Sequence, residues 1–441
     1  MNSEIAIPLI DLRGQRLSRA QYKRAIPRAG LDVAHAMIAI EPILDRVKHG
    51  DEGTLRTLAK EFDGVEPEHI RVPASAIDQA LADLDPKVRI ALETSIGRVR
   101  LFHEAQARET TNVEVVPGAT ISQKWIPVDR VGLYVPGGKA VYPSSVMMNV
   151  VPAQIARVPS IAVASPPQRE FDGLPHPTIL ATCALLGIYE VYAVGGAQAV
   201  AMFAYGVEGL CEPVDLVTGP GNIYVAAAKR ALRGLIAIDS EAGPTEIGIL
   251  ADESALPGEV AADLISQAEH DVSAAAVLVT TSELLAQQVR TELTKRVPLT
   301  RHSERIATAL TGVQSAIVLV DSIDQGIDVM NGYAAEHLEL HVKELEAVGS
   351  KIRNAGAVFM GRYAPVSLGD YSAGSNHVLP TGGCACHSSG LSVQTFLKGV
   401  NFISYDESSF TDIAATVITL ANAEDLPAHG EAMSARFEEK S

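Results

Sequence analysis

A helix expected around residues 260–270 carries two side chains that could bind a metal ion. Its apolar residues fall on one side and leave Gln267 and His270 together on the other side. Side chains three residues apart on a helix lie about 5–6 Å from each other at Cβ, close enough to hold one small ion. A solvated polar face has the same pattern, and this helix alone favours that interpretation.

A second group of polar residues, 369–377, follows the last strand expected in the second half of the chain. Its glycines let the backbone approach a ligand closely, and Asp370 could supply an anionic oxygen to a metal. His377 has two equally good roles, either as a direct ligand or as a hydrogen-bonding residue that holds the loop in place.

The adjacent residues Glu336 and His337 stand where another strand is expected to begin. Successive strand residues point to opposite faces of a sheet, so both side chains reach one site only if that site lies at the strand end. Taken alone, a Glu-His pair is more often an ordinary surface pair.

Glycine-rich turns follow three expected strands, at residues 136–138, 195–198 and 219–222, and each turn precedes a helix. Such turns offer free backbone N–H groups at a helix N-terminus, the usual setting for the phosphates of a dinucleotide. None is a G-x-G-x-x-G, because Tyr224 stands where the third glycine of the last turn would be. Tight strand-to-helix turns without a ligand are the alternative.

Stretches of β-forming residues alternate with helical stretches from residue 130 onward, which predicts parallel sheets in an α/β fold. Five such stretches precede a junction near Ala242, Gly243 and Pro244, and five follow it. We therefore expect two Rossmann-like modules without the standard fingerprint. The expected strands are residues 131–135, 160–165, 190–194, 214–218 and 235–239, then 246–250, 274–280, 316–321, 337–342 and 357–361.

The two ends of the chain differ from these modules. Residues 31–110 are expected to be mainly helical, and Asp85 followed by Pro86 marks the start of one helix. After about Ser392 the strand pattern fades, and the last ~50 residues are expected to form helices with too few apolar positions for a core of their own. We expect this tail to pack on another surface, such as a second subunit.

The chain of 441 residues carries 36 Lys and Arg against 53 Asp and Glu, a formal net charge of −17, and 47% of its residues are apolar. This composition excludes wholesale disorder. The chain has no basic cluster suited to nucleic acid, no apolar run near the ~18 residues of a membrane span and no export signal at its start, so we expect a cytoplasmic protein. Four cysteines, Cys183, Cys211, Cys384 and Cys386, are too few for a disulfide framework.

Taken together, these motifs resemble the histidinol dehydrogenase family. Ten segments in family order carry the resemblance and run through most of the chain. They are VGLYVPGG (131–138), YPSSVMMN (142–149), VGGAQ (194–198), GPGN (219–222), AGPTE (242–246), SQAEH (266–270), AEHL (335–338), GDY (369–371), NHVLP (376–380) and LPAH (426–429).

The resemblance implies that the protein oxidises L-histidinol to L-histidine through the aldehyde, reducing two NAD⁺ per turnover at one zinc ion per subunit of a homodimer. It implies acid/base roles for Glu336 and His337. The implied zinc ligands are Gln267, His270, Asp370 and His429. The implied substrate contacts add Thr245, His337 and Glu424 to these four, and the implied NAD contacts are Tyr134, Gln198 and Asn222.

The domain organisation expected from the pattern and the resemblance has four parts. Residues 1–29 form an N-terminal extension, and residues 131–244 form the α/β domain that binds NAD. Residues 30–130 together with 245–391 form a larger α/β domain that carries the zinc and catalytic residues. Residues 392–441 form an arm that packs on the partner subunit and lends it Glu424 and His429.

A division of labour follows from the residue types. His337, titrating near neutrality, is the expected base for the alcohol, and Glu336 is expected to deprotonate the water that hydrates the aldehyde. One alternative is a covalent thioester formed by Cys384 or Cys386, although only His387 stands near them as a base. Two others are a related zinc-dependent oxidation of another small polar alcohol and a zinc- and nucleotide-binding protein without catalysis.

Overall fold

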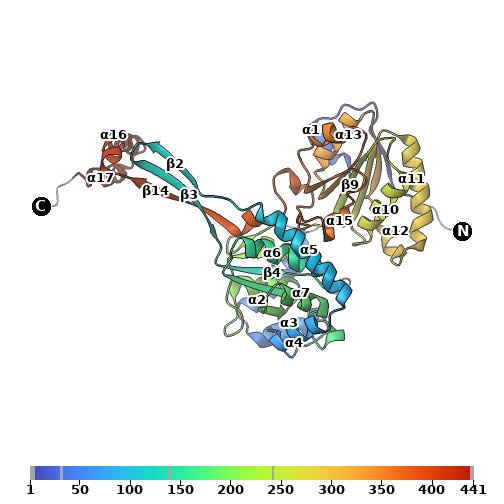
Figure 1. Cartoon of the computed structure of the whole chain (residues 1–441), viewed down its shortest axis with the longest axis horizontal. Helices are drawn as coiled ribbons and strands as arrows, with labels where there is room; N and C mark the ends of the chain where they lie inside the picture. Colours follow the sequence, from blue (N-terminus) through green and yellow to red (C-terminus); the bar gives the residue numbers. More distant parts are fainter. Residues whose placement is uncertain (1–4, 30–32, 138–140, 241–242, 438–441) are drawn as a thin grey trace. The chain divides into compact units, whose positions relative to one another are not determined.

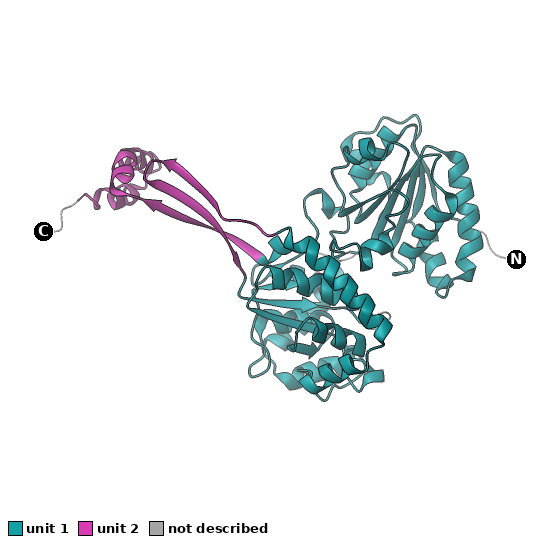
Figure 2. Ribbon diagram, viewed as in Figure 1, with its two compact units in different colours: residues 1–106, 128–396 teal, residues 107–127, 397–441 magenta. Residues whose placement is uncertain are grey.

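The structure is a computed structural model that describes residues 5–29, 33–137, 141–240 and 243–437. It divides into two compact units (Figure 2). The first unit comprises Met1–Gln106 and Val128–Phe396, and the second comprises Ala107–Pro127 and Leu397–Ser441.

The first unit contains a five-stranded parallel sheet with the strand order β6-β5-β4-β7-β8. Its strands are β4 (Arg130–Tyr134), β5 (Ser160–Ser165), β6 (Val191–Ala193), β7 (Leu216–Thr218) and β8 (Ala237–Ile238). The strand that comes first in the chain is central, the next two follow on one side and the last two on the other, which is the order of the first five strands of a Rossmann sheet. Ligands of such sheets bind at the carboxyl ends of the strands, near the point where the order reverses.

The same unit contains a six-stranded parallel sheet with the order β1-β11-β10-β9-β12-β13. Its strands are β1 (Leu9–Asp11), β9 (Glu246–Ala251), β10 (Ala275–Thr280), β11 (Ala316–Leu319), β12 (His337–His341) and β13 (Ala357–Met360). Apart from the added edge strand β1, this order repeats that of the first sheet. The second module is therefore also Rossmann-like.

Both faces of the six-stranded sheet are covered by helices (Figure 1). Because side chains alternate along a strand, Ile249 and Leu278 enter one core with helices α10–α12, while Leu250 and Val279 enter the other core with α1, α13 and α14. The helices are α1 (Arg19–Ala25), α10 (Pro257–Ala268), α11 (Glu283–Arg296), α12 (Ser303–Thr311), α13 (Ile323–Tyr333), α14 (Leu345–Gly349) and α15 (Val366–Tyr371).

The N-terminal segment expected as an extension is part of this module. Ile5 and Ile7 are buried in the core of the six-stranded sheet, and β1 pairs with β11.

Helices α2–α5 belong to the module of the five-stranded sheet and pack on the helices α6–α9 that connect its strands: α2 on α8 and α9, α4 on α7, and α5 on α6. Ile40 of α2 and Leu55 of α3 share a core with Phe203 and Val217. This packing differs from the expected grouping of residues 30–130 with 245–391, because the apolar stripe of α2 faces α8 and α9. The helices are α2 (Val33–Lys48), α3 (Glu52–Phe62), α4 (Ala74–Ala82), α5 (Pro86–Glu104), α6 (Pro143–Ile155), α7 (Pro177–Leu185), α8 (Gly196–Tyr205) and α9 (Ile223–Leu232).

The second unit consists of an antiparallel sheet in the order β14-β3-β2, followed by two helices. The expectation that strands fade after Ser392 was wrong, because β14 pairs along its whole length with β3, a partner almost 300 residues earlier in the chain. Its elements are β2 (Thr111–Val116), β3 (Ala119–Pro127), β14 (Leu397–Tyr405), α16 (Glu407–Ala423) and α17 (Pro427–Ser434). Among its described apolar residues only Ala119, Ala414 and Ala421 are buried.

The α/β fold class and all ten expected strands are confirmed. Helix α5 begins as expected, with the Asp85 carboxylate accepting a hydrogen bond from the backbone N–H of Lys87 at 2.7 Å. Ala242 of the expected junction and Gly138 of the first glycine turn lie outside the described residues. Over the described part of the chain, none of the helices combines the length and the apolar character that a membrane crossing requires.

A buried ion pair fixes the last part of the five-stranded sheet. Lys229 of α9 donates from Nζ to Asp239 and to the carbonyl of Gly219, both at 2.6 Å, and its side chain is 2% exposed. We predict that Lys229→Met lowers the free energy of unfolding by about 3–5 kcal/mol, because Asp239 is left buried without a counter-charge.

Lys351→Met is the matched control, since Lys351 pairs with Asp324 at the same 2.6 Å distance but on the surface. Its loss is expected to stay within about 1 kcal/mol. Urea unfolding followed by circular dichroism measures both values, and equal losses for the two variants would contradict the prediction.

Candidate active site

The pairing of β9 with β12 brings polar residues together at the amino ends of these strands. Thr245 immediately precedes β9 and Glu336 immediately precedes β12. The Thr245 hydroxyl donates a hydrogen bond to Oε2 of Glu336 at 2.5 Å, and the backbone N–H of Glu246 donates to the same oxygen at 3.0 Å. Glu336 is 7% exposed, and burial raises the pKa of its carboxyl group.

Helix α10 ends beside this pair and supplies Gln267. Its Nε2 donates a hydrogen bond to Oγ1 of Thr245 at 2.7 Å, which leaves the amide oxygen to face elsewhere. That oxygen, Oε1, is buried and has no hydrogen-bond partner among the described residues. A buried hydrogen-bond acceptor without a donor destabilises the folded protein, so we expect a ligand or a cation to bind this oxygen. The sequence pattern put Gln267 on a polar face, but its side chain is only 1% exposed.

Two histidines near Glu336 and Gln267 each have the ring nitrogen Nδ1 beside a backbone carbonyl. Nδ1 of His270 lies 3.2 Å from the carbonyl of Gln267, and Nδ1 of His337 lies 3.1 Å from the carbonyl of Glu246. A carbonyl oxygen only accepts hydrogen bonds, so each Nδ1 carries the proton and each Nε2 keeps a lone pair. Nε2 of His337 is buried without a hydrogen bond in the described structure, available to a metal, a proton or a substrate.

Helix α15 brings Asp370 to the same place, with its Oδ1 at 3.8 Å from Nε2 of His337. Nδ1 of His377 donates to the carbonyl of Asp370 at 2.9 Å, and its Nε2 lies 3.3 Å from Oγ of Ser145. Both ring nitrogens of His377 are thus engaged with protein groups, which favours the loop-holding role over that of a direct ligand. Burial lowers the pKa of His377, which therefore stays neutral beside His270 and His337.

The ends of two helices make this location favourable for a cation. Helix α10 follows β9 and α13 precedes β12, so both helices cross the sheet and reach the amino ends of these strands with their carboxyl termini. The carboxyl end of a helix carries a partial negative charge. One carboxylate oxygen, one amide oxygen and imidazole nitrogens then form a donor set that suits zinc.

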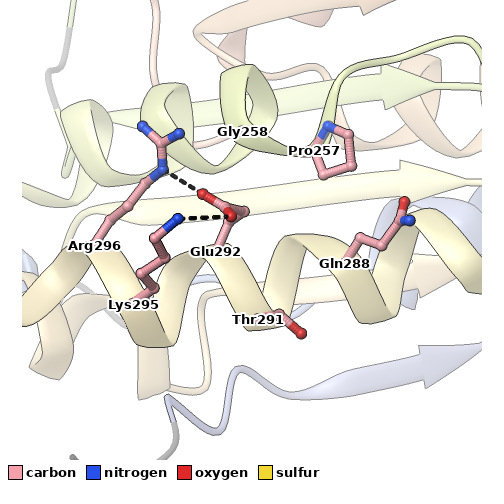
Figure 3. A pocket seen from close by; sticks show the side chains of 7 residues that line it. All are labelled: Pro257, Gly258, Gln288, Thr291, Glu292, Lys295 and Arg296. Carbon is pink, nitrogen blue, oxygen red and sulfur yellow. Dashed lines mark hydrogen bonds and ion pairs between the residues drawn. The ribbon is translucent and has the colours of Figure 1, made fainter.

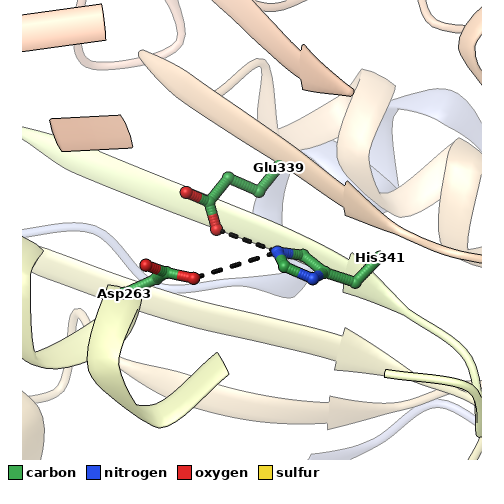
Figure 4. A group of neighbouring side chains, drawn as sticks. All are labelled: Asp263, Glu339 and His341. Atoms are coloured by element: carbon green, nitrogen blue, oxygen red, sulfur yellow. Dashed lines mark hydrogen bonds and ion pairs between the residues drawn. The ribbon is translucent and has the colours of Figure 1, made fainter. Parts of the chain in front are cut away.

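A different group of three residues in this module brings possible metal ligands close together (Figure 4). Ligand atoms of Asp263, Glu339 and His341 lie within 4.8 Å of one another. These atoms already bind one another or the backbone: Nε2 of His341 lies 3.3 Å from Glu339, whose other oxygen accepts from the N–H of Val366 at 2.7 Å. Because the three residues join α10, β12 and the start of α15, they position the elements that carry Gln267, His337 and Asp370.

A cavity of about 410 Å³ lies between α10 and α11 (Figure 3). Its wall includes Glu292 and the two basic side chains that pair with it, Lys295 and Arg296. Pro257 and Gly258 at the start of α10 also line it, so it lies at the opposite end of the helix from Gln267. The cavity is separate from the cluster of candidate catalytic residues.

The candidate nucleotide contacts lie at the carboxyl ends of the five-stranded sheet. The hydroxyl of Tyr134, at the end of β4, accepts a hydrogen bond from the N–H of Gly196 at 3.1 Å. Burial raises the pKa of this phenol to about 12, so it stays protonated. Gln198, in the first turn of α8, is 3% exposed and lies beside the same glycine turn. The sheet therefore brings these two residues together.

Asn222 lies at the next turn of the sheet, as the N-cap of α9. Its Oδ1 accepts from the backbone N–H groups of Tyr224 and Val225 at 3.0 and 3.2 Å, while its side chain remains exposed. The preceding Gly219 has φ +112°, and a Cβ there would lie 2.0 Å from the carbonyl oxygen of Tyr134. Only glycine lets this turn pack against β4.

The remaining predicted residues, Glu424 and His429, belong to the second unit. Glu424 is the C-cap of α16, His429 lies in α17, and both are exposed.

The thiols of Cys384 and Cys386 lie in a short 3-10 helix and are partly exposed. Nδ1 of the neighbouring His387 is 2.9 Å from the hydroxyl of Ser388, which directs this nitrogen away from a role as thiol base. No observation favours a covalent route through these cysteines.

Three residues near the candidate sites were not recognised from the sequence. Glu246 lies within a resembling segment, but its ion pair with Arg28 joins residues more than 200 positions apart. Asp63 ends helix α3 and hydrogen-bonds to Gln198, and nothing in its local sequence signals this contact.

The fold and these sites define a class: an α/β protein of two Rossmann-like modules, with glycine-rich strand-to-helix turns on one sheet and a candidate cation site on the other. A family model described as histidinol dehydrogenase matches residues 26–437 of the chain. The chain is 62% identical to a histidinol dehydrogenase of Thermobifida fusca and 58% identical to one of Nocardia farcinica, with 98% and 99% of each chain covered, respectively. A crystal structure of histidinol dehydrogenase from Elizabethkingia anophelis matches with a TM-score of 0.90 at 32% identity, covering 99% of each chain.

The chain therefore belongs to the histidinol dehydrogenase family, whose members are NAD-dependent oxidoreductases of histidine biosynthesis.

The two candidate metal clusters can be separated by substitution. We predict that His270→Asn lowers zinc affinity at least about 100-fold, because it removes a ligand nitrogen, whereas His341→Gln changes it by about tenfold or less, as a residue that only positions ligands. Competition with a chromophoric chelator measures both affinities. The opposite order of effects would place the metal at Asp263, Glu339 and His341.

Proposed function

We propose that this protein oxidises L-histidinol to L-histidine through the aldehyde, reducing two NAD⁺ at a zinc-dependent site. One observation carries the proposal: Oε1 of Gln267 and Nε2 of His337 are buried without hydrogen bonds in the described structure, beside the buried carboxyl group of Glu336. The family membership supports the substrate. A site built from neutral donors and one nearby carboxylate, Asp370, suits a small substrate that carries an amine and an imidazole.

Gln267, His270 and Asp370 would hold the zinc, with His429 of a second copy of the chain as a further ligand. A divalent ion beside one carboxylate and otherwise neutral ligands leaves a net charge of about +1. When bound, the zinc would serve mainly as a template that orients the amine and the imidazole of the substrate. The free lone pair on Nε2 of His270 and the free Oε1 of Gln267 fit this assignment.

His337 is the proposed base of the first oxidation. Its Nδ1 proton is committed to the carbonyl of Glu246, so Nε2 is the nitrogen that accepts a proton from the substrate hydroxyl. Hydride passes from the alcohol carbon to the nicotinamide at the same time. The products of this step are the aldehyde, NADH and one proton held on His337.

Glu336 is the proposed base of the second oxidation. Burial raises the pKa of its carboxyl group, which makes the carboxylate a stronger base, and the hydrogen bonds from Thr245 and Glu246 keep it in place. The carboxylate removes a proton from the water that adds to the aldehyde. The hydrated aldehyde then transfers a second hydride to a second NAD⁺ and becomes the carboxylate product.

We further propose that the five-stranded module binds NAD through Tyr134, Gln198 and Asn222, and that the six-stranded module carries the zinc and the acid/base pair. The glycine turns at the carboxyl ends of β6 and β7 support this division. The enzyme would thus use two different edges of its two sheets, one for the cofactor and one for the substrate.

A homodimer with shared active sites is part of the proposal. The second unit has almost no buried apolar residues of its own, and Phe402, Ile403 and Leu420 are exposed on it. Such a unit gains stability by packing on a partner. Glu424 and His429 are exposed on its helices, where they could reach the substrate and the zinc of the partner subunit.

Substitution of the proposed second base separates the two half-reactions. We predict that Glu336→Gln leaves histidinol oxidation to the aldehyde largely intact and slows aldehyde oxidation at least roughly tenfold, because the amide cannot accept a proton from water. NADH absorbance after mixing with histidinol or with the aldehyde reports each step. Glu344→Gln, at an exposed residue of the same module, is the control. Equal losses in both steps would reject the division of labour.

The shared site predicts complementation between two inactive variants. His337→Asn and His429→Asn are each expected to be inactive as homodimers, but a mixture reassembled from unfolded chains should recover roughly a quarter of the wild-type sites, because each mixed dimer contains one intact site. A mixture that stays inactive, while reassembled wild-type protein regains its activity, would show that each site is built within one chain.

A further inference from the structure

Asp63 holds an unusual position for a surface-helix terminus. It is the C-cap of α3, yet its carboxylate reaches the turn between β6 and α8. Nε2 of Gln198 donates to its Oδ2 at 3.4 Å, and Oδ1 lies 2.8 Å from the point that a Cβ on Gly195 would occupy. Only a glycine at position 195 lets this carboxylate approach so closely.

Asp63 lies beside residues that are proposed to contact NAD. Gln198 bonds to it directly, and the same turn binds Tyr134 through the N–H of Gly196. The negative charge of Asp63 also contributes, after burial, to the raised pKa of the Tyr134 phenol. Asp63 thus faces two of the three residues assigned to the nucleotide.

The sheet order shows which part of a nucleotide this carboxylate would meet. In a Rossmann half, an acidic residue at the end of the second strand binds the hydroxyls of the adenosine ribose. The second strand here is β5, which is followed by Pro166, Pro167 and Gln168 and has no acidic residue at its end. A Cβ on Gly195 would lie 3.0 Å from Pro166 and 2.8 Å from Asp63, so the carboxylate from α3 lies beside the end of β5.

One further polar atom just beyond β5 lacks a hydrogen-bond partner. Nε2 of Gln168 is buried without a hydrogen bond within the described residues, and it lies 3.3 Å from the point that a Cβ on Gly137 would occupy, beside Pro166. Among the described residues Asp63 forms no ion pair, and burial raises the pKa of its carboxyl group to about 6. Buried polar groups without partners are costly, and the hydroxyls of a ribose would supply a donor to Asp63 and an acceptor to Gln168.

We propose that Asp63 binds the ribose hydroxyls of the adenosine half of the dinucleotide and thereby selects NAD⁺ over NADP⁺. The carboxylate accepts hydrogen bonds from two neighbouring hydroxyls and repels the 2′-phosphate of NADP⁺. This inference rests on the proposed function, since it requires a dinucleotide at the carboxyl ends of the five-stranded sheet. Asp63 thus replaces the acidic residue that other Rossmann sheets carry at the end of the second strand and that β5 lacks.

A purely structural role is the competing explanation. Helix α8 has no side chain capping its N-terminus, and a carboxylate near that end would stabilise the helix without any ligand. In that case Asp63 affects the stability of the protein but not the choice of nucleotide.

The test compares Asp63→Asn with Asp83→Asn in the full-length enzyme. Asp83 is the matched control, because it is also the C-cap of a helix, accepts a hydrogen bond from a glutamine at 2.9 Å and is exposed far from any glycine turn. For Asp63→Asn we expect KM for NAD⁺ to rise roughly tenfold or more, and the ratio of kcat/KM for NADP⁺ to that for NAD⁺ to rise by a similar factor. Asp83→Asn should change neither.

Asp63→Glu, which keeps the charge, should still discriminate against NADP⁺ even if its affinity for NAD⁺ falls. Unchanged nucleotide constants in Asp63→Asn, with a lower unfolding temperature, would overturn the inference in favour of helix capping. Binding of NADH, followed by its fluorescence, keeps the test independent of turnover. If the wild-type protein binds no dinucleotide at all, the proposed function fails. If it binds NAD⁺ and the Asp63 variants bind it equally well, only the role of Asp63 fails.

Discussion

The parallel pairing of β9 with β12 is the constraint on which the candidate active site depends. The register that places His337 beside Ile247 also places Thr245 within hydrogen-bonding distance of Glu336, and the Gln267 amide follows through its bond to Thr245. A shift of one residue would turn every side chain of β12 to the opposite face. The register is secured because both faces of the six-stranded sheet are buried under helices. The same core that stabilises the module therefore fixes the geometry of its polar residues.

The two sheets share a strand order but use opposite edges. The glycine turns proposed to bind the nucleotide lie at the carboxyl ends of the five-stranded sheet, where helix N-termini favour phosphate. The candidate cation site lies at the amino ends of β9 and β12, where α10 and α13 end with their carboxyl termini and favour positive charge. One fold repeated in one chain can thus hold an anionic cofactor and a cation, because the two edges of a sheet flanked by helices have opposite polarity.

Much of this fold is predictable from the sequence, and the limits are instructive. Most strands of both modules are largely apolar runs between polar turns, so the local pattern suffices to find them. Asp85 with Pro86 marks a helix start by local hydrogen bonding. Strand β14 was missed because its stability depends on β3, far away in the chain. The apolar stripe of α2 predicts that this helix packs against the rest of the protein, but it does not show which of the two similar modules the helix joins.

The candidate site shows the same division between local and long-range information. The spacing of Gln267 and His270 suggested one ion between two residues of a helix, but α10 ends at Ala268 and His270 lies just beyond it. The burial of Gln267 and its bond to Thr245 arise from strand pairing. The contact of Asp63 with Gln198 joins a helix end to a distant glycine turn, and no short motif encodes it. Side chains whose neighbours come from other elements are identified only through the fold or through relatives.

We propose that Gln267, His270 and Asp370 bind one metal ion. Anomalous diffraction at the zinc absorption edge, from crystals of the zinc-loaded protein, tests this binding. We predict one zinc peak per chain, about 2.0–2.2 Å from Oε1 of Gln267, Nε2 of His270 and a carboxylate oxygen of Asp370. A peak between Asp263, Glu339 and His341, with the Gln267 amide pointing away from any metal, would contradict it.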